Sequence, residues 1–235
     1  MTNLRNNSVD VPARSLFVTG TDTDVGKTRI ARLILEALRA RGLRAFGFKP
    51  VACGDRADAE ALRAASTDGE STPLDAINPV HFPEALAPIA VDAGAPDRCR
   101  IIDGFEALAS QADWVIVEGA GGWEMPLTPE WSMADLAADL AAPVLLVAAN
   151  RLGVLNHAKL TILAIRRRGL PISGIVLNDT EARAPSGFDR ARETNLESIR
   201  RMVPDLPVWS LAFEAPALPP ETIDGLISGS GYRSS

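Results

Sequence analysis

The chain has 235 residues, 46 % of them hydrophobic, and a formal net charge of −6 at pH 7. This length and composition predict a globular protein with one sizeable α/β domain rather than two small ones. The acidic balance argues against a general binder of nucleic acids or membrane surfaces, because such proteins need a basic field.

The two ends of the chain differ from its middle. Residues 1–14 mix polar residues with proline and show no period, and the last residues are rich in Gly and Ser. We therefore expect flexible tails at 1–14 and 229–235 around one domain at 15–228. No apolar stretch approaches the ~18 residues of a membrane span, and the N-terminal residues lack the apolar core of an export signal. With only two cysteines as well, the chain is expected to be cytoplasmic, with reduced thiols.

The first predicted elements are a strand, a polar loop and a helix. The apolar run 16–18 stops at Gly20, the loop reaches Gly26, and from Lys27 onward apolar residues recur at helical spacing. Such a loop places backbone N–H groups and a helix N-terminus around one point, where both favour an anion. Lys27 adds a positive charge for β- and γ-phosphate oxygens, and the Thr28 hydroxyl suits the magnesium of a nucleoside triphosphate. This stretch predicts a nucleotide phosphate site.

The loop is one residue longer than the usual phosphate-loop pattern G-x-x-x-x-G-K-[ST]. That pattern requires glycine at position 21, where the chain has Thr21, and the nearest glycine is Gly20. A glycine-containing turn before an ordinary helix is the alternative interpretation. The strand before the loop and the helix after it favour the phosphate site.

The next predicted strand, at 43–49, ends in Lys49 just before a proline. In an open parallel sheet the carboxyl ends of the strands face the ligand crevice, so we expect Lys49 near the phosphate loop. Only three of the 24 basic residues are lysine. A lysine ammonium is compact and mobile, which suits close approach to a reacting phosphoryl group. A solvated lysine at a strand end is the alternative.

A short helix is expected within 51–66. Its acidic residues are Asp55, Asp58 and Glu60. They are either candidate metal ligands or charges that favour a helix start, and the residues alone do not decide between these two interpretations. The segment 67–100 is rich in Pro, Ala and Asp and has no sustained period, so we expect an irregular wall of a substrate site. His81 within it is expected to pack or to cap a turn rather than to catalyse.

The next strand ends in an acidic residue that glycines follow. A predicted helix at 101–112 precedes the apolar run 114–117, which ends at Glu118. A carboxylate in this place, beside a phosphate loop, is expected to bind magnesium or to position water. The glycines after it, such as Gly121, let backbone amides approach a ligand.

The rest of the chain continues to alternate between helices and strands. Helices are predicted at 133–140, 155–168 and 187–202, and strands at 143–149, 172–177 and 208–211. This succession predicts a single domain with a mostly parallel sheet flanked by helices on both faces, which is a P-loop NTPase-like fold.

Five segments together resemble one family, dethiobiotin synthetase, the ATP-dependent ligase that closes the ureido ring in biotin synthesis. In chain order they are VTGTDTDVGKT (18–28), GFKPVACG (47–54), ADWVIVEGAGGW (112–123), LGVLNHA (152–158) and VLND (176–179). A phosphate loop alone indicates only a nucleotide-binding superfamily, whereas this combination in one short chain is typical of the family.

The resemblance implies a role for each matched position. The catalytic residues would be Lys27, Lys49 and Thr23, and the nucleotide would contact Asp24, Val25, Gly26, Lys27, Thr28 and, at its base, Asn178. Thr28, Asp58 and Glu118 fall on magnesium-binding positions. Substrate contacts would come from Thr23, Lys49, Cys53, Gly121, Gly153, Val154 and Asn156. Of these, Gly121 and the residues of 153–156 match segments that bind the substrate carboxylate across a homodimer interface. Cys53 departs from the serine common in the family, and a thiol is a weaker hydrogen-bond donor than a hydroxyl.

The implied substrates are 7,8-diaminononanoate (diaminopelargonate), CO2 and ATP, with Mg2+ as cofactor. One amine would capture CO2 as a carbamate, the carbamate would attack the γ-phosphorus, and the second amine would open the mixed anhydride. Two other classes remain as alternatives. A partition-type switch ATPase usually carries an additional lysine early in the loop, where this chain has Thr21 and Asp22. An amidotransferase-type synthetase domain normally continues into a glutaminase domain.

Overall fold

A six-stranded parallel sheet forms the centre of the molecule. The computed structural model describes residues 14–90, 94–182 and 189–229. Across the sheet the strands follow the order β2-β5-β1-β6-β7-β8. Their bounds are β1 Arg14–Gly20, β2 Ala45–Phe48, β5 Trp114–Glu118, β6 Val144–Ala149, β7 Ile172–Asn178 and β8 Val208–Leu211. The predicted tails lie outside the described residues, apart from Arg14 at the start of β1 and Gly229 at the end of α8.

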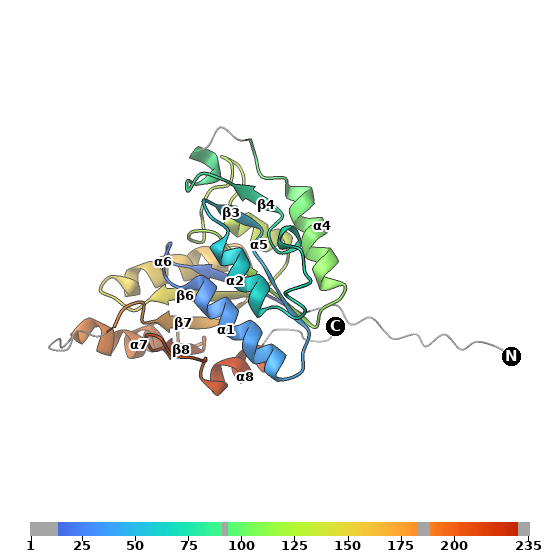
Figure 1. The fold of residues 1–235 in the computed structure, drawn as a ribbon. Helices are drawn as coiled ribbons and strands as arrows, with labels where there is room; N and C mark the ends of the chain where they lie inside the picture. The colour runs from blue at the N-terminus through green and yellow to red at the C-terminus, as the bar shows by residue number, and fades with distance from the viewer. Residues whose placement is uncertain (1–13, 91–93, 183–188, 230–235) are drawn as a thin grey trace.

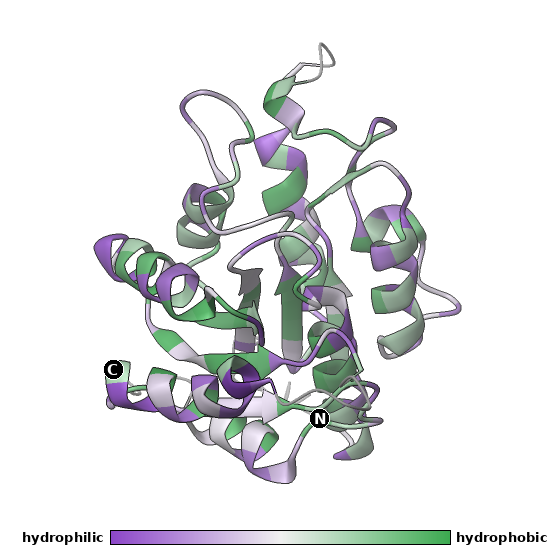
Figure 2. Ribbon diagram, turned by 90° about the vertical axis from the view of Figure 1, so that its left-hand side faces the viewer, coloured by the Kyte–Doolittle hydropathy of each residue, from purple (hydrophilic) through white to green (hydrophobic). Residues whose placement is uncertain are grey.

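Helices surround this sheet (Figure 1). They are α1 Lys27–Ala40, α2 Ala57–Ala65, α3 Leu74–Ile77, α4 Arg98–Ala109, α5 Met133–Asp139, α6 Val154–Arg167, α7 Arg190–Met202 and α8 Pro220–Gly229. In Figure 2 the strands at the centre are mostly hydrophobic, whereas hydrophilic residues lie mainly on helix surfaces and in loops. Among the described residues, no helix combines the length and the apolar character that crossing a membrane requires.

Alternate side chains of β6 belong to two separate clusters. Leu146 and Ala148 pack with residues of α6 and α7, whereas Leu145 and Val147 belong to the cluster that includes α1. Because successive side chains of a strand point to opposite faces, α1 and the α6–α7 pair cover opposite faces of the sheet. The predicted fold class, a mostly parallel sheet flanked by helices on both faces, is confirmed.

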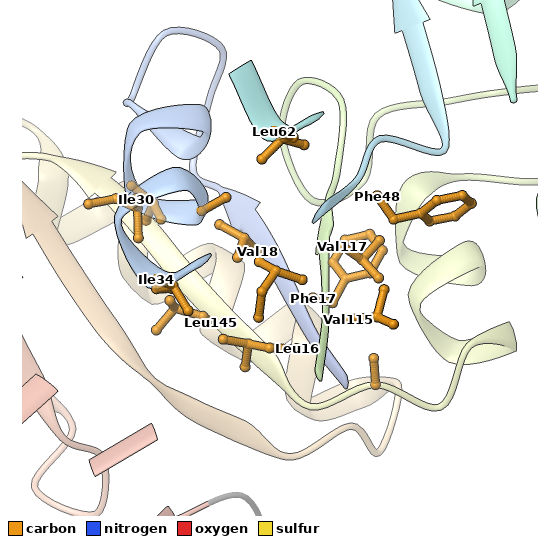
Figure 3. Close-up of a cluster of buried hydrophobic side chains, with 14 of the residues drawn as sticks. Leu16, Phe17, Val18, Ile30, Ile34, Phe48, Leu62, Val115, Val117 and Leu145 are labelled. Carbon is orange, nitrogen blue, oxygen red and sulfur yellow. The ribbon is translucent and has the colours of Figure 1, made fainter. Parts of the chain in front are cut away.

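The central strand β1 is buried on both faces, which fixes the start of the phosphate loop. Figure 3 shows Leu16 and Val18 pointing toward Ile34 of α1, with Phe17 on the other side beside Val117 of β5. Burial on both faces is typical of parallel sheets with helices on each side. The loop therefore leaves the carboxyl end of a strand that has little freedom to move.

The segment 67–100 differs in part from the prediction. It contains α3, the strand β4 (Val80–Phe82) and a 3-10 helix, Pro88–Ala90. Strand β4 pairs in parallel with β3 (Val51–Cys53) in a second, two-stranded sheet, which lies above α2 in Figure 1. The expectation of an irregular segment was wrong here because three-residue strands are too short to show a recognisable alternation. Helix α8 was likewise not predicted.

Candidate active site

The phosphate loop needs residues that accept a left-handed backbone. Asp24 has φ 57° and Gly26 has φ 93°, and aspartate and glycine tolerate this region better than most residues. A Cβ atom on Gly26 would lie 2.2 Å from Nδ2 of Asn178, so glycine is also required for space. Within the described part of the chain, no side chain caps α1 at Gly26. That leaves the first-turn N–H groups available to an anion.

Two buried lysines point into the same space but have different surroundings. The Nζ of Lys27 donates to the carbonyl oxygen of Asp22 at 3.0 Å. Burial, and then the nearby charge of Lys49, lower the pKa of Lys27. Burial alone would lower the pKa of Lys49 too, but attraction to Glu118 and Asp58 outweighs it, so the pKa of Lys49 is raised. Its Nζ lies 2.6 Å from Oε1 of Glu118 and 2.7 Å from Oδ2 of Asp58.

A hydroxyl and two carboxylates meet beside Lys49. The Oγ1 of Thr28 lies 2.7 Å from Oδ1 of Asp58 and 2.8 Å from Oε1 of Glu118. Burial opposes ionisation of Asp58, but Lys49 and the hydrogen bonds from Lys49 and Thr28 lower its pKa overall. Glu118 is fully buried, and its Oε2 has no hydrogen-bond partner among the described residues. A buried, unpartnered carboxylate oxygen is costly, so this atom favours a cation at the site.

These groups suit magnesium. Mg2+ prefers oxygen ligands and is usually held by one or two carboxylates together with water and substrate phosphates. Thr28, Asp58 and Glu118 supply that donor set beside the phosphate loop. Sequence reasoning alone left Asp58 ambiguous, and the fold places its carboxylate within hydrogen-bond distance of Thr28.

A cavity of about 660 Å3 joins these residues into one site. From the predicted site it is lined by Thr23, Asp24, Gly26, Lys27, Thr28, Lys49, Cys53, Asp58, Glu118 and Gly121. Asp55, one of the acidic residues that the sequence left as a candidate metal ligand, also lines it, and further lining residues that were not predicted are Ala52, Ala85, Leu86, Ala87, Ala120 and Met125. Burial raises the pKa of the Cys53 thiol, although the charge of Lys49 partly opposes this. The segment 67–100 does supply part of the wall, through residues 85–87.

Some predicted site residues lie outside this cavity. Asn178 is buried, and its Nδ2 donates to the carbonyl oxygen of Val25 at 3.0 Å while its Oδ1 accepts from Arg29 at 3.1 Å. Val25 is itself buried. In this chain the Asn178 side chain thus holds the main chain of the phosphate loop at Val25. Its contact with a nucleotide base stays a prediction.

The segment predicted to contact substrate across a dimer interface lies at the start of α6. Gly153 and Asn156 are exposed and Val154 is buried in the core. None of the three lines the cavity of the same chain.

Comparison with known proteins gives the family. A family model described as an AAA domain matches residues 14–209. The chain is 46 % identical over 171 residues to the ATP-dependent dethiobiotin synthetase BioD of Akkermansia muciniphila, covering 72 % of this chain and 79 % of that one. It is 40 % identical over 201 residues to BioD 1 of Escherichia coli, covering 82 % and 87 %. The chain belongs to the dethiobiotin synthetase family. The family resemblance of the five segments is confirmed, as is the prediction of an ATP-dependent ligase that forms a C–N bond.

Solved structures extend the likeness in fold alone. A plasmid partition protein from Borrelia burgdorferi, bound to AMPPNP, has a TM-score of 0.55 at 11 % identity and covers 92 % of this chain and 97 % of its own. The septum site-determining protein MinD from Pyrococcus horikoshii, in complex with Mg-ADP, has a TM-score of 0.52 at 15 % identity and covers 91 % and 86 %. The P-loop NTPase-like fold that the sequence predicts is therefore confirmed for this member of the dethiobiotin synthetase family.

Proposed function

We propose that the protein converts 7,8-diaminononanoate, CO2 and ATP into dethiobiotin, ADP and phosphate. The observation that carries this proposal is that Lys27 and Lys49 line the same cavity as the Thr28, Asp58 and Glu118 cluster, in a chain of the dethiobiotin synthetase family. The site contains cations and backbone amides for phosphates, together with room for a second substrate. That combination fits transfer of a phosphoryl group to a bound small molecule.

The phosphoryl step needs positioning and neutralisation of charge more than covalent help. Lys27 leaves the carbonyl oxygen of Asp22 and binds the β- and γ-phosphate oxygens, while loop N–H groups donate to the same oxygens. No protein nucleophile is required. The attacking group is a carbamate oxygen of the substrate, which forms a bond to the γ-phosphorus as the bond from phosphorus to ADP breaks.

The carbamate and the second amine need different help. Lys49 is held at one place by Asp58 and Glu118, so its ammonium provides a fixed positive charge for both the γ-phosphate and the carbamate that attacks it, and Thr23 provides a hydroxyl nearby. The second amine must be uncharged to attack the carbamate carbon, so its ammonium form gives up a proton before the attack. Its attack forms the second C–N bond and releases phosphate, which takes the bridging oxygen with it.

Magnesium is part of the proposal. Thr28, Asp58 and Glu118 would hold it, and the unpartnered Oε2 of Glu118 supports this assignment. When bound, the ion neutralises phosphate charge and orients the phosphates.

We also propose that the active enzyme is a homodimer in the cytoplasm. Four exposed leucines on or just before α6 support the homodimer: Leu152, Leu155, Leu160 and Leu163. A grouped set of exposed apolar side chains favours a protein partner. A second copy of the chain seated here would carry Gly153, Val154 and Asn156 toward a neighbouring cavity, where the family places the carboxylate of the substrate.

Product analysis tests the proposed reaction. The purified protein is incubated with the diamine, bicarbonate and MgATP, and the ureido product is sought by mass spectrometry. The proposal predicts dethiobiotin in equal amount to ADP, and only when all three substrates are present. ATP hydrolysis that is independent of the diamine would instead favour a switch ATPase. The partition-type alternative shares the fold with this chain, so the reaction rather than the fold separates the two.

A further inference from the structure

Asn78 lies outside the cavity but contacts the main chain of a residue inside it. It follows α3 directly and is 1 % exposed. Its Nδ2 donates to the carbonyl oxygen of Lys49 at 2.8 Å and to that of Val80 at 2.9 Å. Its Oδ1 accepts from Nε of Arg56 at 2.9 Å.

These partners fix the orientation of the amide and exclude most substitutes. Both carbonyl oxygens only accept hydrogen bonds and the Arg56 guanidinium only donates, so the NH2 group must face Lys49 and Val80. Both N–H bonds of that group are used. An aspartate of the same size would turn a carboxylate oxygen toward two carbonyl oxygens, with no hydrogen to share.

The main chain of Lys49 depends on this region for its position. Lys49 follows β2, one residue past the last paired position of that strand, Phe48. Its N–H donates to the carbonyl oxygen of Ile77 at 2.7 Å, and its carbonyl oxygen accepts from Asn78. The turn that contains Asn78 thus satisfies both main-chain groups of Lys49.

Arg56 extends the same contact to the helix that carries Asp58. It is the N-cap residue of α2, and its Nη2 donates to the main-chain oxygen of Asn78 at 2.9 Å. Asp58 lies two residues further along, and its carboxylate meets the Lys49 ammonium. Contacts therefore join Arg56 to Asn78, Asn78 to Lys49 and Lys49 to Asp58, and the main chain at the start of α2 joins Asp58 back to Arg56.

We propose that Asn78 is a positioning residue, which fixes the main chain of Lys49, and through it the place of the ammonium, and fixes the Asp58 carboxylate through Arg56. The inference rests on the proposed function in that these two groups act on phosphates and their metal. A displacement of about 1 Å at a catalytic group costs on the order of 10²-fold in rate, so a buried amide that holds two such groups has a large effect without touching substrate.

Steady-state kinetics of Asn78→Asp give the first test. We expect kcat to fall on the order of 10²-fold while the Michaelis constant for the diamine changes by less than about threefold. Ile223→Ala is the control, because it removes a buried side chain from α8, which supplies no site residue. It should lower the melting temperature and leave both constants unchanged. Equal kinetic effects of the two variants, or a change confined to the Michaelis constant, would overturn the proposal.

A binding measurement without turnover gives the second test. A non-hydrolysable ATP analogue is titrated calorimetrically in the absence of magnesium, so that only the lysine branch is measured. Asn78→Asp should weaken binding about tenfold in the natural chain and less than about twofold when Lys49 is already alanine, because two residues that act as one unit are not additive. Equal weakening in both backgrounds would show that Asn78 does not act through Lys49. If Asn78→Asp does not fold, Asn78→Ser, which keeps one donor, is measured in the same cycle.

Arg56→Ala tests the other branch. It should leave the metal-free affinity for the analogue unchanged and reduce, by about tenfold, the gain in affinity that magnesium produces. An unchanged magnesium effect would remove Asp58 from the proposal. All these binding results are independent of ring closure, so a failure of the proposed reaction in the natural protein would be seen separately.

Discussion

Lys27 and Lys49 lie in one cavity, yet their surroundings suit different tasks. Lys49 is paired with two carboxylates, which raise its pKa and hold it in place. The ammonium of Lys27 contacts a main-chain oxygen, and its pKa is lowered. Lys27 is therefore the lysine that is freer to move onto phosphates, and Lys49 is the fixed charge.

Lys27→Ala should abolish most activity and leave the fold intact. Charge-assisted hydrogen bonds are worth ~1.5–3 kcal/mol each, so the loss of one predicts a fall in kcat/KM of at least about tenfold, and the loss of two a fall of at least about 10²-fold. Circular dichroism should stay as in the natural chain, because Lys27 lines the cavity and is not part of the apolar core. Arg32→Ala, which removes an exposed cation from the same helix, serves as the control. Near-normal turnover of Lys27→Ala would contradict the assignment.

For single residues, the sequence predicts which side chains supply the chemistry better than it predicts which atoms those side chains contact. Lys27, Thr28 and Glu118 follow from motif and strand position, and the cavity includes all three. Asn178 matches a family position for the nucleotide base, but its side chain holds the carbonyl oxygen of Val25. Asn78 has no motif of its own. Its contacts arise only when α3, β2 and α2 are packed together, and such long-range packing has no local sequence signal.

Among the elements, α5 shows how local sequence fixes a helix start. Ser132 and Asp135 form a capping box, in which each side chain bonds the main-chain N–H of the other. Arg168 adds an ion pair with Asp135. Burial opposes ionisation of Asp135, but the hydrogen bonds from Ser132 and the charge of Arg168 lower its pKa overall.

Asp135→Ala should lower the free energy of unfolding by about 1 kcal/mol at neutral pH, the usual effect of a lost cap. Because the folded-state pKa of Asp135 lies below its unfolded value of about 3.9, the charge contributes fully above that value. The contribution is lost as pH falls through the folded pKa. The difference between the natural chain and the variant should therefore shrink below about pH 4. Urea titrations at several pH values measure it, and a difference that grows with acid would contradict this account.

The elements that the sequence did not predict are either very short or contain residues that are rare in such elements. Strands β3 and β4 have three residues each, so a period of two has no room to appear. Helix α8 carries Gly225 and ends in glycine, and glycine is a poor helix former. Long helices with one apolar face, such as α1 and α6, were predicted within a few residues of their observed bounds.

In the whole molecule, the residues at the start of α6 that are predicted to contact substrate can reach a cavity only if two chains form a dimer. Asn156 stands among those leucines, away from the cavity of its own chain. In a closed twofold dimer, each site would take Lys27 from one subunit and Asn156 from the other.

Mixed dimers test this arrangement. Asn156→Ala should raise the Michaelis constant for the diamine more than that for ATP. At a low concentration of the diamine this variant is therefore nearly inactive, as Lys27→Ala is at any concentration.

When the two variants are produced together, a mixed dimer has one site with both natural residues. Random pairing then predicts recovery of about a quarter of natural activity. Mixtures no more active than the separate variants, or a monomer by light scattering, would exclude a shared site.

Leu163→Glu tests whether the exposed leucines form the proposed dimer contact. A charge within the proposed apolar contact should separate the subunits, because an unpaired buried charge is strongly unfavourable. Light scattering should then report a monomer of 25.0 kDa, with little activity left. A dimeric Leu163→Glu would place the contact elsewhere.

The path of one oxygen atom tests whether a carbamate oxygen attacks the γ-phosphorus in this cavity. An oxygen that enters as CO2 bridges carbon and phosphorus in the mixed anhydride and leaves with phosphate when the ring closes. A switch ATPase takes that oxygen from water. Short turnover with oxygen-18-labelled CO2 should therefore give phosphate carrying one labelled oxygen. Unlabelled phosphate, with ATP consumed and the CO2 pool still labelled, would contradict the mechanism assigned to Lys27 and Lys49.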